Sequence, residues 1–294
     1  MGKQTNTTLV NIRTALQQAI NCLSKNSPSA RLDAEVLLSY SLEKPRTFLY
    51  AYPEHLLSSP QWQTYQQLIF QRDKGIPVAY LTNTREFWSL PLHVNQDTLI
   101  PRPDTELIVE LTLSLLANKP YATILDLGTG SGAIALALAS ERRNWQIFAT
   151  DINPNAAHTA FTNASMLGLL NVSVFCSNWF EAVSPCLFDA IVSNPPYLAE
   201  QDPHLLQGDV RFEPRQALVS GTKGLDALNH LIQQSMMRLQ PGGLLLLEHG
   251  YDQKIAVTTR LKQTGYDKVR CWQDTQGNDR VSGGWRTKSV LENI

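Results

Sequence analysis

The chain has 294 residues, of which 43% are hydrophobic, and a formal net charge of −1. This length allows a full α/β domain and a smaller partner domain, while the balanced charge argues against general attraction to nucleic acid. The four cysteines lack C-x-x-C spacing, so neither a metal site nor a disulfide framework is expected. A polar start without a signal-peptide core, and the lack of any membrane-length apolar run, predict a cytoplasmic protein with no membrane partner.

Residues 1–75 have a helical pattern. Apolar residues recur at spacings of three and four from Leu9 to Leu23, which predicts a first helix. A second helix is expected to start near Ser29, and its predicted buried face consists of Leu32, Val36 and Tyr40. Ser59-Pro60 is predicted to be the N-cap and first residue of a further helix, whose core positions are Trp62, Tyr65, Leu68 and Ile69. We interpret residues 1–75 as a small all-helical domain.

Residues 76–103 have a different character. Short pieces that we predict to be extended are Val78–Thr82, Arg85–Leu90, Pro91–Val94 and Leu99–Pro103. They predict a β-hairpin that links the helical domain to the rest of the chain.

Residues 104–294 alternate between helix and strand patterns, which is typical of an α/β domain with a mostly parallel sheet. Later strands are expected at Val172–Phe175, Phe188–Ser193 and Leu244–Glu248. Helices are expected around residues 155–167, 226–239 and 253–264. The tail from Val269 to Trp285 suits a closing antiparallel hairpin.

A glycine loop follows the first predicted strand of this domain. The strand Ile124–Leu127 leads into Gly128-Thr129-Gly130-Ser131-Gly132 and then into the apolar run Ala133–Ala139. Glycines let the backbone approach a ligand, and a helix N-terminus favours polar or anionic groups. The next strand ends at Asp151, whose carboxylate suits the ribose hydroxyls of either NAD or S-adenosylmethionine. The alternative role for Asp151 is the N-cap of the helix that begins near Pro154.

The turn Asn194-Pro195-Pro196-Tyr197 follows the strand that ends at Ser193. Two consecutive prolines cannot continue a hydrogen-bonded ladder, so the chain leaves the sheet here in a stiff turn. An Asn amide, proline carbonyls and a Tyr ring could hold a planar group that carries NH2. An ordinary strand-ending turn is the alternative. A dehydrogenase has no evident use for this turn, so the two motifs together favour S-adenosylmethionine over NAD.

A glycine loop, an acid after the second strand and Asn-Pro-Pro-Tyr after the fourth resemble the class I S-adenosylmethionine-dependent methyltransferases. The chain also contains further motifs in order, which are Ala79–Thr82, Arg85–Trp88, Leu99–Glu106, Asp126–Gly132, Ser193–Tyr197, Gly208–Pro214 and Leu247–Gly250. With these motifs the sequence most resembles the bacterial release factor N5-glutamine methyltransferase family. The resemblance implies a Rossmann-like class I methyltransferase domain at residues 104–294, with residues 1–75 docking the substrate and 76–103 as the linker.

The resemblance also implies a function. The family transfers a methyl group from S-adenosylmethionine to the side-chain amide of the glutamine in the Gly-Gly-Gln motif of class I peptide chain release factors. The implied catalytic residues are Asn194, Pro195 and Tyr197, and the substrate-binding residues are Asn194, Pro195, Pro196 and Tyr197. The implied cofactor-binding residues are Gly128, Thr129, Gly130, Ser131, Gly132, Asp151, Trp179 and Asn194. No direct nucleic-acid partner is expected.

Two positions depart from the family pattern. Asn83 stands where glycine is usual, and asparagine tolerates positive φ better than most residues. Asn178 stands in place of aspartate before Trp179, and its side-chain oxygen could still accept a hydrogen bond from an adenine amino group.

A carboxamide nitrogen is a poor nucleophile, so alignment and desolvation are what a protein can contribute. We predict that Asn194 and the Pro195 carbonyl accept the two N–H bonds of the target amide while Tyr197 covers it. No general base is evident. Glu213 and Asp209 are candidates only because their motif lies close to the Asn-Pro-Pro-Tyr motif in the sequence, and the alternative is that each is a solvated charge on a loop.

Other functions share part of this pattern. Glutamine methylation of a ribosomal protein is the nearest alternative. Methylation of an adenine or cytosine amino group in nucleic acid would use the same turn, but the near-neutral charge and the lack of basic runs argue against it. A non-catalytic S-adenosylmethionine-binding scaffold would have no need for Asn194.

Overall fold

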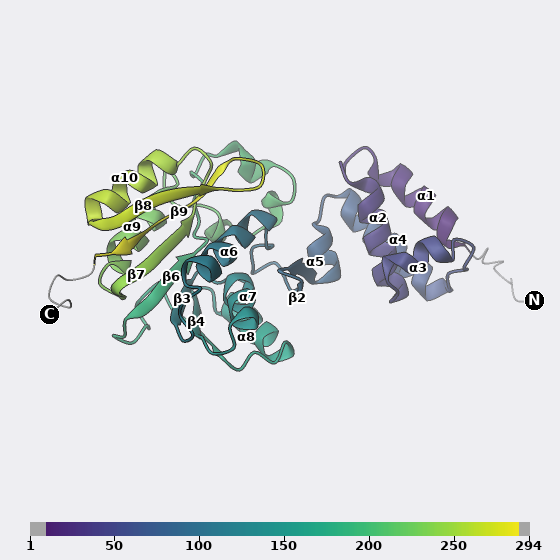
Figure 1. The fold of residues 1–294 in the computed structure, drawn as a ribbon. Helices are drawn as coiled ribbons and strands as arrows, with labels where there is room; N and C mark the ends of the chain where they lie inside the picture. Colours follow the sequence, from purple (N-terminus) through teal and green to yellow (C-terminus); the bar gives the residue numbers. More distant parts are fainter. Residues whose placement is uncertain (1–9, 288–294) are drawn as a thin grey trace, which may run out of the picture. The chain divides into compact units, whose positions relative to one another are not determined.

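The computed structural model describes residues 10–287. The chain divides into two compact units (Figure 1). The helical unit contains the residues through Asn83 together with the distant segment Gln207–Phe212, and the sheet unit contains Thr84–Leu206 and the residues from Glu213 onward. Within residues 10–287, no helix is both long and apolar enough to cross a bilayer.

The helical unit consists of α1 (Ile12–Leu23), α2 (Ala30–Leu42), α3 (Arg46–Ala51), α4 (Ser59–Asp73) and α5 (Val78–Thr82). Its core includes the fully buried residues Leu23, Leu37, Leu38 and Leu49, together with Tyr65. Helix α1 begins after the N-cap Asn11, and Leu9 lies outside the described residues. Helix α4 begins one residue earlier than predicted, because Ser58 and Gln61 form a capping box. Helix α3 was not predicted.

The predicted buried face of α2 is wrong. Leu32 and Tyr40 are 46% and 45% exposed, and the core is instead formed by Ala34, Leu37, Leu38 and Leu42. A spacing of four is compatible with either face of a helix, so the pattern alone did not identify the buried one. Helices α1 and α4 pack against the face of α2 that carries Ala34, Leu37, Leu38 and Leu42. The stripe Leu32–Tyr40 therefore remains at the surface of the helical unit.

The segment Val78–Thr82 is helical rather than extended. Proline at the N-cap presets φ, and the Pro77 carbonyl accepts hydrogen bonds from the amides of Tyr80 and Leu81. Asn83 ends the helix in the left-handed conformation with φ of 52°, as its type allows. The hairpin consists of β1 (Thr84–Phe87) and β2 (Leu90–His93), and it clusters with the sheet unit. Leu99–Arg102, predicted to be extended, is irregular.

Gln207–Phe212 is held within the helical unit by polar contacts. Arg72, whose side chain is 10% exposed, donates to Asp209 Oδ1 at 3.1 Å and to Asp33 Oδ2 at 2.7 Å. Arg211 donates to the carbonyl of Lys74 at 3.3 Å. This segment therefore belongs structurally to helices that precede it by more than a hundred positions in sequence.

The sheet unit is built around a seven-stranded sheet with the order β5-β4-β3-β6-β7-β9-β8. The strands are β3 (Thr123–Leu127), β4 (Gln146–Asp151), β5 (Val172–Cys176), β6 (Phe188–Ser193), β7 (Leu239–Glu248), β8 (Tyr266–Gln273) and β9 (Asp279–Arg286). The first five are parallel, and β8 and β9 form the predicted closing antiparallel hairpin. This sheet confirms the α/β fold class. Because the order reverses between β3 and β6, a crevice opens at the carboxyl ends of these strands.

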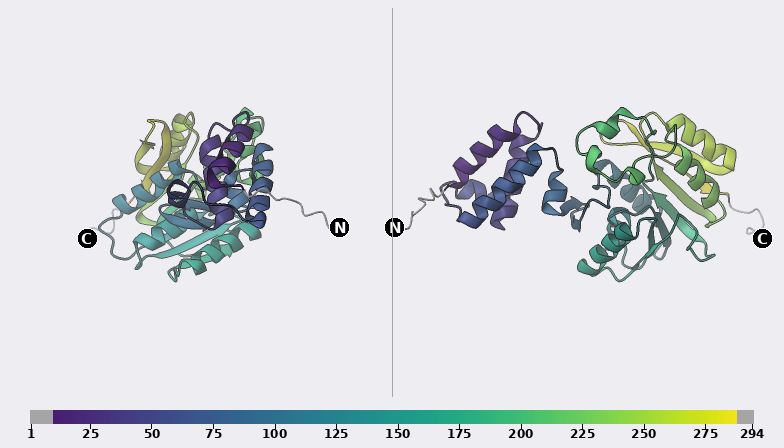
Figure 2. Two further views of the ribbon diagram at one scale, coloured as in Figure 1. Left: turned by 90° about the vertical axis from the view of Figure 1, so that its right-hand side faces the viewer. Right: turned by 180° about the vertical axis from the view of Figure 1, so that it is seen from behind.

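Helices cover both faces of this sheet, as Figures 1 and 2 show. Neighbouring strand residues point to opposite faces, so Ile124 belongs to one core and Leu125 to the other. Helices α6 (Glu106–Leu115), α7 (Ala133–Glu141) and α8 (Pro154–Met166) contribute to the first core. Helices α9 (Asp226–Ser235) and α10 (Lys254–Thr264) contribute to the second. The sheet is thereby fixed on both sides, which makes its carboxyl edge a rigid base for a site.

Candidate active site

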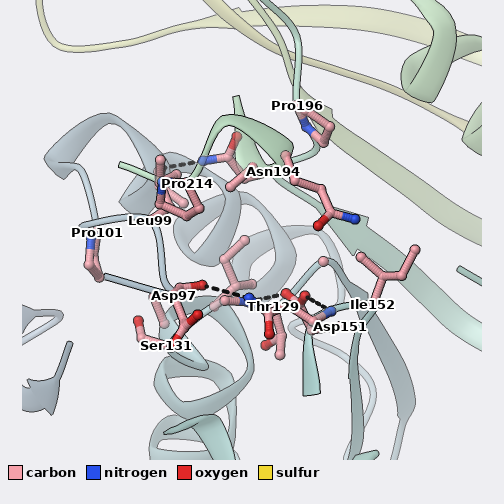
Figure 3. A pocket seen from close by; sticks show the side chains of 18 of the residues that line it. Asp97, Leu99, Pro101, Thr129, Ser131, Asp151, Ile152, Asn194, Pro196 and Pro214 are labelled. Carbon is pink, nitrogen blue, oxygen red and sulfur yellow. Dashed lines mark hydrogen bonds between the residues drawn. The ribbon is translucent and has the colours of Figure 1, made fainter. Parts of the chain in front are cut away.

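A cavity of about 290 Å³ lies at the carboxyl ends of β3, β4 and β6. Figure 3 shows Asn194 on the opposite side of this cavity from Thr129 and Asp151. The sequence-predicted residues that line it are Gly128, Thr129, Gly130, Ser131, Asp151, Trp179, Asn194 and Pro196. Gly132, Pro195 and Tyr197 do not line it. The fold thus brings the glycine loop, the acid after β4 and the Asn-Pro-Pro-Tyr turn to one place.

The glycine loop is fastened by two carboxylates. Gly130 N donates to Asp151 Oδ2 at 2.9 Å. Beneath the loop, Asp126 Oδ2 accepts from Thr129 Oγ1 at 2.6 Å and from Ala135 N at 3.2 Å. Complete burial raises the pKa of Asp126 to about 7. These bonds connect β3, the loop and the first turn of α7, so the loop is held ready for a ligand.

Two glycines of this loop serve different purposes. A Cβ on Gly132 would lie 2.8 Å from Leu136 Cδ1 and 3.3 Å from Ala160 Cβ, whereas a Cβ on Gly130 would meet nothing within 4 Å. Both have positive φ, at 90° and 58°. Gly132 is therefore required for the packing of α7 against α8, and Gly130 leaves room at the cavity wall.

We expect Gly132→Ala to lower the unfolding midpoint by more than Gly130→Ala, because only Gly132→Ala adds a clash to the strain of positive φ, which costs about 1 kcal/mol. Gly130→Ala is expected to weaken ligand binding instead. Thermal unfolding and ligand titration of the two variants measure these effects. Equal unfolding midpoints would contradict the assignment.

Asp151 and Trp179 frame a second side of the cavity. Asp151 Oδ1 accepts from Asn153 N at 2.9 Å, and burial raises the pKa of Asp151. The N-cap of α8 is Asn153, so the alternative capping role for Asp151 is wrong. Trp179 has a positive φ of 49° and lies 3.6 Å from a Cβ built on Gly128. Asn178 donates to Glu181 Oε1 at 2.7 Å and does not line the cavity.

The Asn-Pro-Pro-Tyr turn presents Asn194 to the cavity. Asn194 Nδ2 donates to Thr105 Oγ1 at 3.1 Å, and Pro196 also lines the wall. Pro195 is buried. Tyr197 is predicted to cover the amide with its ring, and its hydroxyl donates to Glu248 Oε1 at 3.3 Å. Burial, reinforced by the negative Glu248, raises the pKa of Tyr197.

An ion pair joins two loops that form the remaining wall. Arg102 Nη2 donates to both carboxylate oxygens of Glu213 at 2.7 Å, and the Glu213 side chain is fully buried. Glu213 is therefore not a solvated loop charge. Both of its carboxylate oxygens bind Arg102, so it is not placed to act as a base. Asp209, the second candidate base, is bonded to Arg72 in the helical unit. The pair fastens the loop that carries Pro214 and Gln216 beside the cavity.

Several lining residues were not assigned to the site from the sequence. They include Asp97, Leu99, Thr105, Ile152 and Gln216. Leu99 and Thr105 lie within Leu99–Glu106, one of the motifs that carried the family resemblance. Their place in that motif is the sequence feature that could have assigned them to the site. Asp97 comes from an irregular loop, where no local pattern indicates its partners.

Comparison with known proteins agrees with this geometry. Residues 14–82 match the family described as the PrmC N-terminal domain, and residues 106–211 match the methyltransferase small domain. A methyltransferase from Pyrococcus furiosus superposes with a TM-score of 0.51 at 21% identity, covering 67% of this chain and 89% of that one. The hMettl16 catalytic domain with an RNA hairpin superposes with a TM-score of 0.56 at 17% identity, covering 85% and 92%. The chain therefore has the fold of the class I methyltransferases.

Curated relatives identify the family more closely. The release factor glutamine methyltransferase of Shewanella oneidensis is 49% identical over 93% of this chain and 95% of its own length. Those of Salmonella typhimurium and Escherichia coli are 50% and 49% identical, each over 92% of this chain and 96% of their own length. The chain belongs to the release factor glutamine methyltransferase family.

Proposed function

We propose that this protein transfers a methyl group from S-adenosylmethionine to the side-chain amide nitrogen of the glutamine in the Gly-Gly-Gln motif of class I release factors, in the cytoplasm. The observation that carries the proposal is the placement of Asn194. Its amide group faces the glycine loop across one cavity, and its NH2 group is already bonded to Thr105. The side-chain oxygen is left to accept a hydrogen bond from an incoming amide.

The residues of the cavity fit S-adenosylmethionine. Gly128 and Gly130 allow close approach of a ligand to the backbone, Asp151 offers a carboxylate to hydroxyl groups, and Trp179 offers an aromatic face. When bound, S-adenosylmethionine supplies an activated methyl group on a sulfonium. The chain then has to orient the acceptor and keep water away, and neither task requires a covalent intermediate on the protein.

In the proposed mechanism, the NH2 group of the substrate amide donates two hydrogen bonds. Asn194 Oδ1 accepts one of them, and the Pro195 carbonyl oxygen accepts the other. This orientation directs the amide nitrogen toward the glycine-loop side of the cavity. In the net reaction the nitrogen gains a methyl group and loses one proton, which water can accept. Orientation of this kind is worth about 7 kcal/mol or more in favourable systems.

The direct test offers labelled S-adenosylmethionine with intact release factor, ribosomal protein and DNA in parallel. We expect label on the release factor alone, at the glutamine of Gly-Gly-Gln when the product is digested and sequenced by mass. Label on the ribosomal protein or on DNA, with none on the release factor, would exclude the proposed substrate.

The cofactor assignment predicts the effect of Asp151→Asn. The substitution replaces one carboxylate oxygen, an acceptor, with an NH2 donor. This NH2 would face either the Gly130 N–H or the ligand hydroxyls, and one hydrogen bond would be lost, so we expect S-adenosylmethionine affinity to fall about 10- to 100-fold. Calorimetry on the wild-type chain is expected to show no NAD binding. Tight NAD binding would overturn the choice between the two readings of the glycine loop.

We further propose that the helical domain predicted at residues 1–75 docks the body of the release factor. A site that grips one amide cannot distinguish a single glutamine from all others, so further contacts must select the substrate. Exposed apolar side chains on the helical unit support this role, and they are Leu32, Tyr40, Tyr50, Tyr52, Leu56 and Phe70.

A further inference from the structure

Glu248 is a buried carboxylate that the mechanism above does not use. It lies at the end of β7 and is 1% exposed. Its Oε2 atom has no hydrogen-bond partner among the described residues. Burying a carboxylate with an unused acceptor is costly, so a purely structural role is a poor explanation for this residue.

Two donors act on this carboxylate, and both lie beside Asn194. The Tyr197 hydroxyl donates to Oε1 at 3.3 Å. The Thr105 hydroxyl is the second donor, and this hydrogen bond lowers the pKa of Glu248. Thr105 is also the residue that Asn194 contacts, at 3.1 Å from its Nδ2. Glu248 and Asn194 are therefore connected through one hydroxyl group.

This connection has a fixed polarity. An ionised carboxylate can only accept hydrogen bonds, and a threonine hydroxyl has a single hydrogen to donate. With that hydrogen directed to Glu248, Thr105 Oγ1 can only accept from its other neighbour. Asn194 must then turn its NH2 group toward Thr105, which leaves Oδ1 for the cavity.

We propose that Glu248 is a positioning residue which, through Thr105, holds the Asn194 side-chain amide with Oδ1 facing the substrate amide. The inference rests on the proposed function, because an incoming NH2 group needs an acceptor. In the reversed orientation Asn194 would present its own NH2 to the NH2 of the substrate. Two donors would face each other, and neither would form a hydrogen bond.

The charge state of Glu248 sets the polarity, so turnover is expected to depend on pH. Burial raises the pKa of Glu248 to about 7, although Thr105, Arg280 and Tyr197 act to lower it. Asp104 adds to the rise. Once protonated, the carboxyl can donate to Thr105, which can then donate to Asn194 Oδ1. We therefore expect kcat to fall as the pH is lowered through about 7.

The experiment compares Thr105→Val with Thr105→Ser in the full chain, using intact release factor as substrate. Valine keeps the shape of threonine and removes the hydroxyl, while serine retains the hydroxyl. We expect Thr105→Val to lower kcat about 100-fold, with the KM for release factor and the affinity for S-adenosylmethionine changed less than about threefold. Thr105→Ser is expected to restore most of the turnover.

Glu248→Gln provides the second comparison. A glutamine does not titrate, so the fall of kcat between about pH 8 and pH 6 should disappear in this variant. The same orientation can be followed without turnover by NMR of the Asn194 side-chain NH2. Its resonance is expected to titrate in the wild type, and to be independent of pH in both Glu248→Gln and Thr105→Val.

Three outcomes would overturn the inference. They are wild-type kcat in Thr105→Val, an equal loss in Thr105→Ser, and an unchanged pH profile and Asn194 titration in Glu248→Gln. Failure of the proposed function looks different: the wild-type chain would transfer no methyl to release factor, while the Asn194 resonance would still titrate in the wild type and not in the two variants.

Discussion

Asn194→Ala is expected to lower kcat for release factor methylation by about 100-fold or more, while the affinity for S-adenosylmethionine falls less than about fivefold. Asn194 is half-buried at the cavity wall, and its NH2 is fixed on Thr105. Its oxygen is therefore an acceptor oriented before the substrate arrives, which costs no reorganisation during the reaction. Alanine removes that acceptor without touching the glycine loop or Asp151. Steady-state kinetics at saturating release factor, together with calorimetry, separate the two effects.

Asn178→Ala is the matched control. Asn178 has the same side chain and precedes Trp179 of the cavity wall, but its amide bonds to Glu181 outside the cavity. We expect this variant to keep kcat within about threefold of the wild type. Near-normal turnover of Asn194→Ala at saturating substrate, or an equal loss in Asn178→Ala, would remove the proposed role of Asn194.

Local patterns were enough to predict the α/β class of the sheet unit and several residues that line its cavity, although the helix expected at residues 226–239 ends at Ser235 and the strand expected from Leu244 begins at Leu239. The strand, glycine loop and helix from Ile124 to Ala139 are encoded by neighbouring residues, because buried parallel strands and tight turns restrict the residue types that fit. Asn83 adopts positive φ, as expected for an asparagine at a position where the family usually has glycine. The strand order then brings Asp151 and Asn194 to one edge without any further signal, since all the parallel strands end there.

What the sequence did not predict depends on contacts between distant segments. The buried face of α2 is selected by α1 and α4, and a four-residue spacing cannot indicate which face they cover. Arg102 and Glu213 lie in two separate motifs, and their ion pair became visible only once the fold placed both beside the cavity. Glu248 had the pattern of a strand end, and its connection to Asn194 runs through Thr105 in a third segment.

The exposed stripe of α2 gives the docking proposal a specific location. Leu32 and Tyr40 are about half exposed and lie on one face of the helix. Aromatic and aliphatic side chains of this kind are common in the centre of protein interfaces. Their exposure is unexplained by the packing of the helical unit, whose core uses the opposite face of α2. We therefore predict that this stripe contacts the release factor.

Leu32→Ser combined with Tyr40→Ser is expected to raise the KM for intact release factor about 10-fold or more, with kcat changed less than about threefold. A short Gly-Gly-Gln peptide cannot reach the stripe, so it should be a poor substrate for the wild type and the variant alike. Tyr121→Ser is the matched control, because Tyr121 is a 72% exposed tyrosine of the sheet unit. An equal rise of KM in Tyr121→Ser would show that the effect is not specific to the stripe.

Removal of residues 1–75 is expected to produce a larger rise of KM for intact release factor, again with a smaller change in kcat and little effect on the peptide. The truncation also deprives Asp209 of Arg72, so it disturbs the segment Gln207–Phe212 as well as the docking surface. Asp209→Asn in the full chain weakens that contact alone and is expected to leave KM nearly unchanged. A folded truncated chain with normal cofactor affinity that methylates intact release factor as efficiently as the full chain would mean that the helices only support the fold. A rise of KM in Asp209→Asn as large as that of the truncation would assign the effect to the segment, because the helices and their stripe remain in place in that variant.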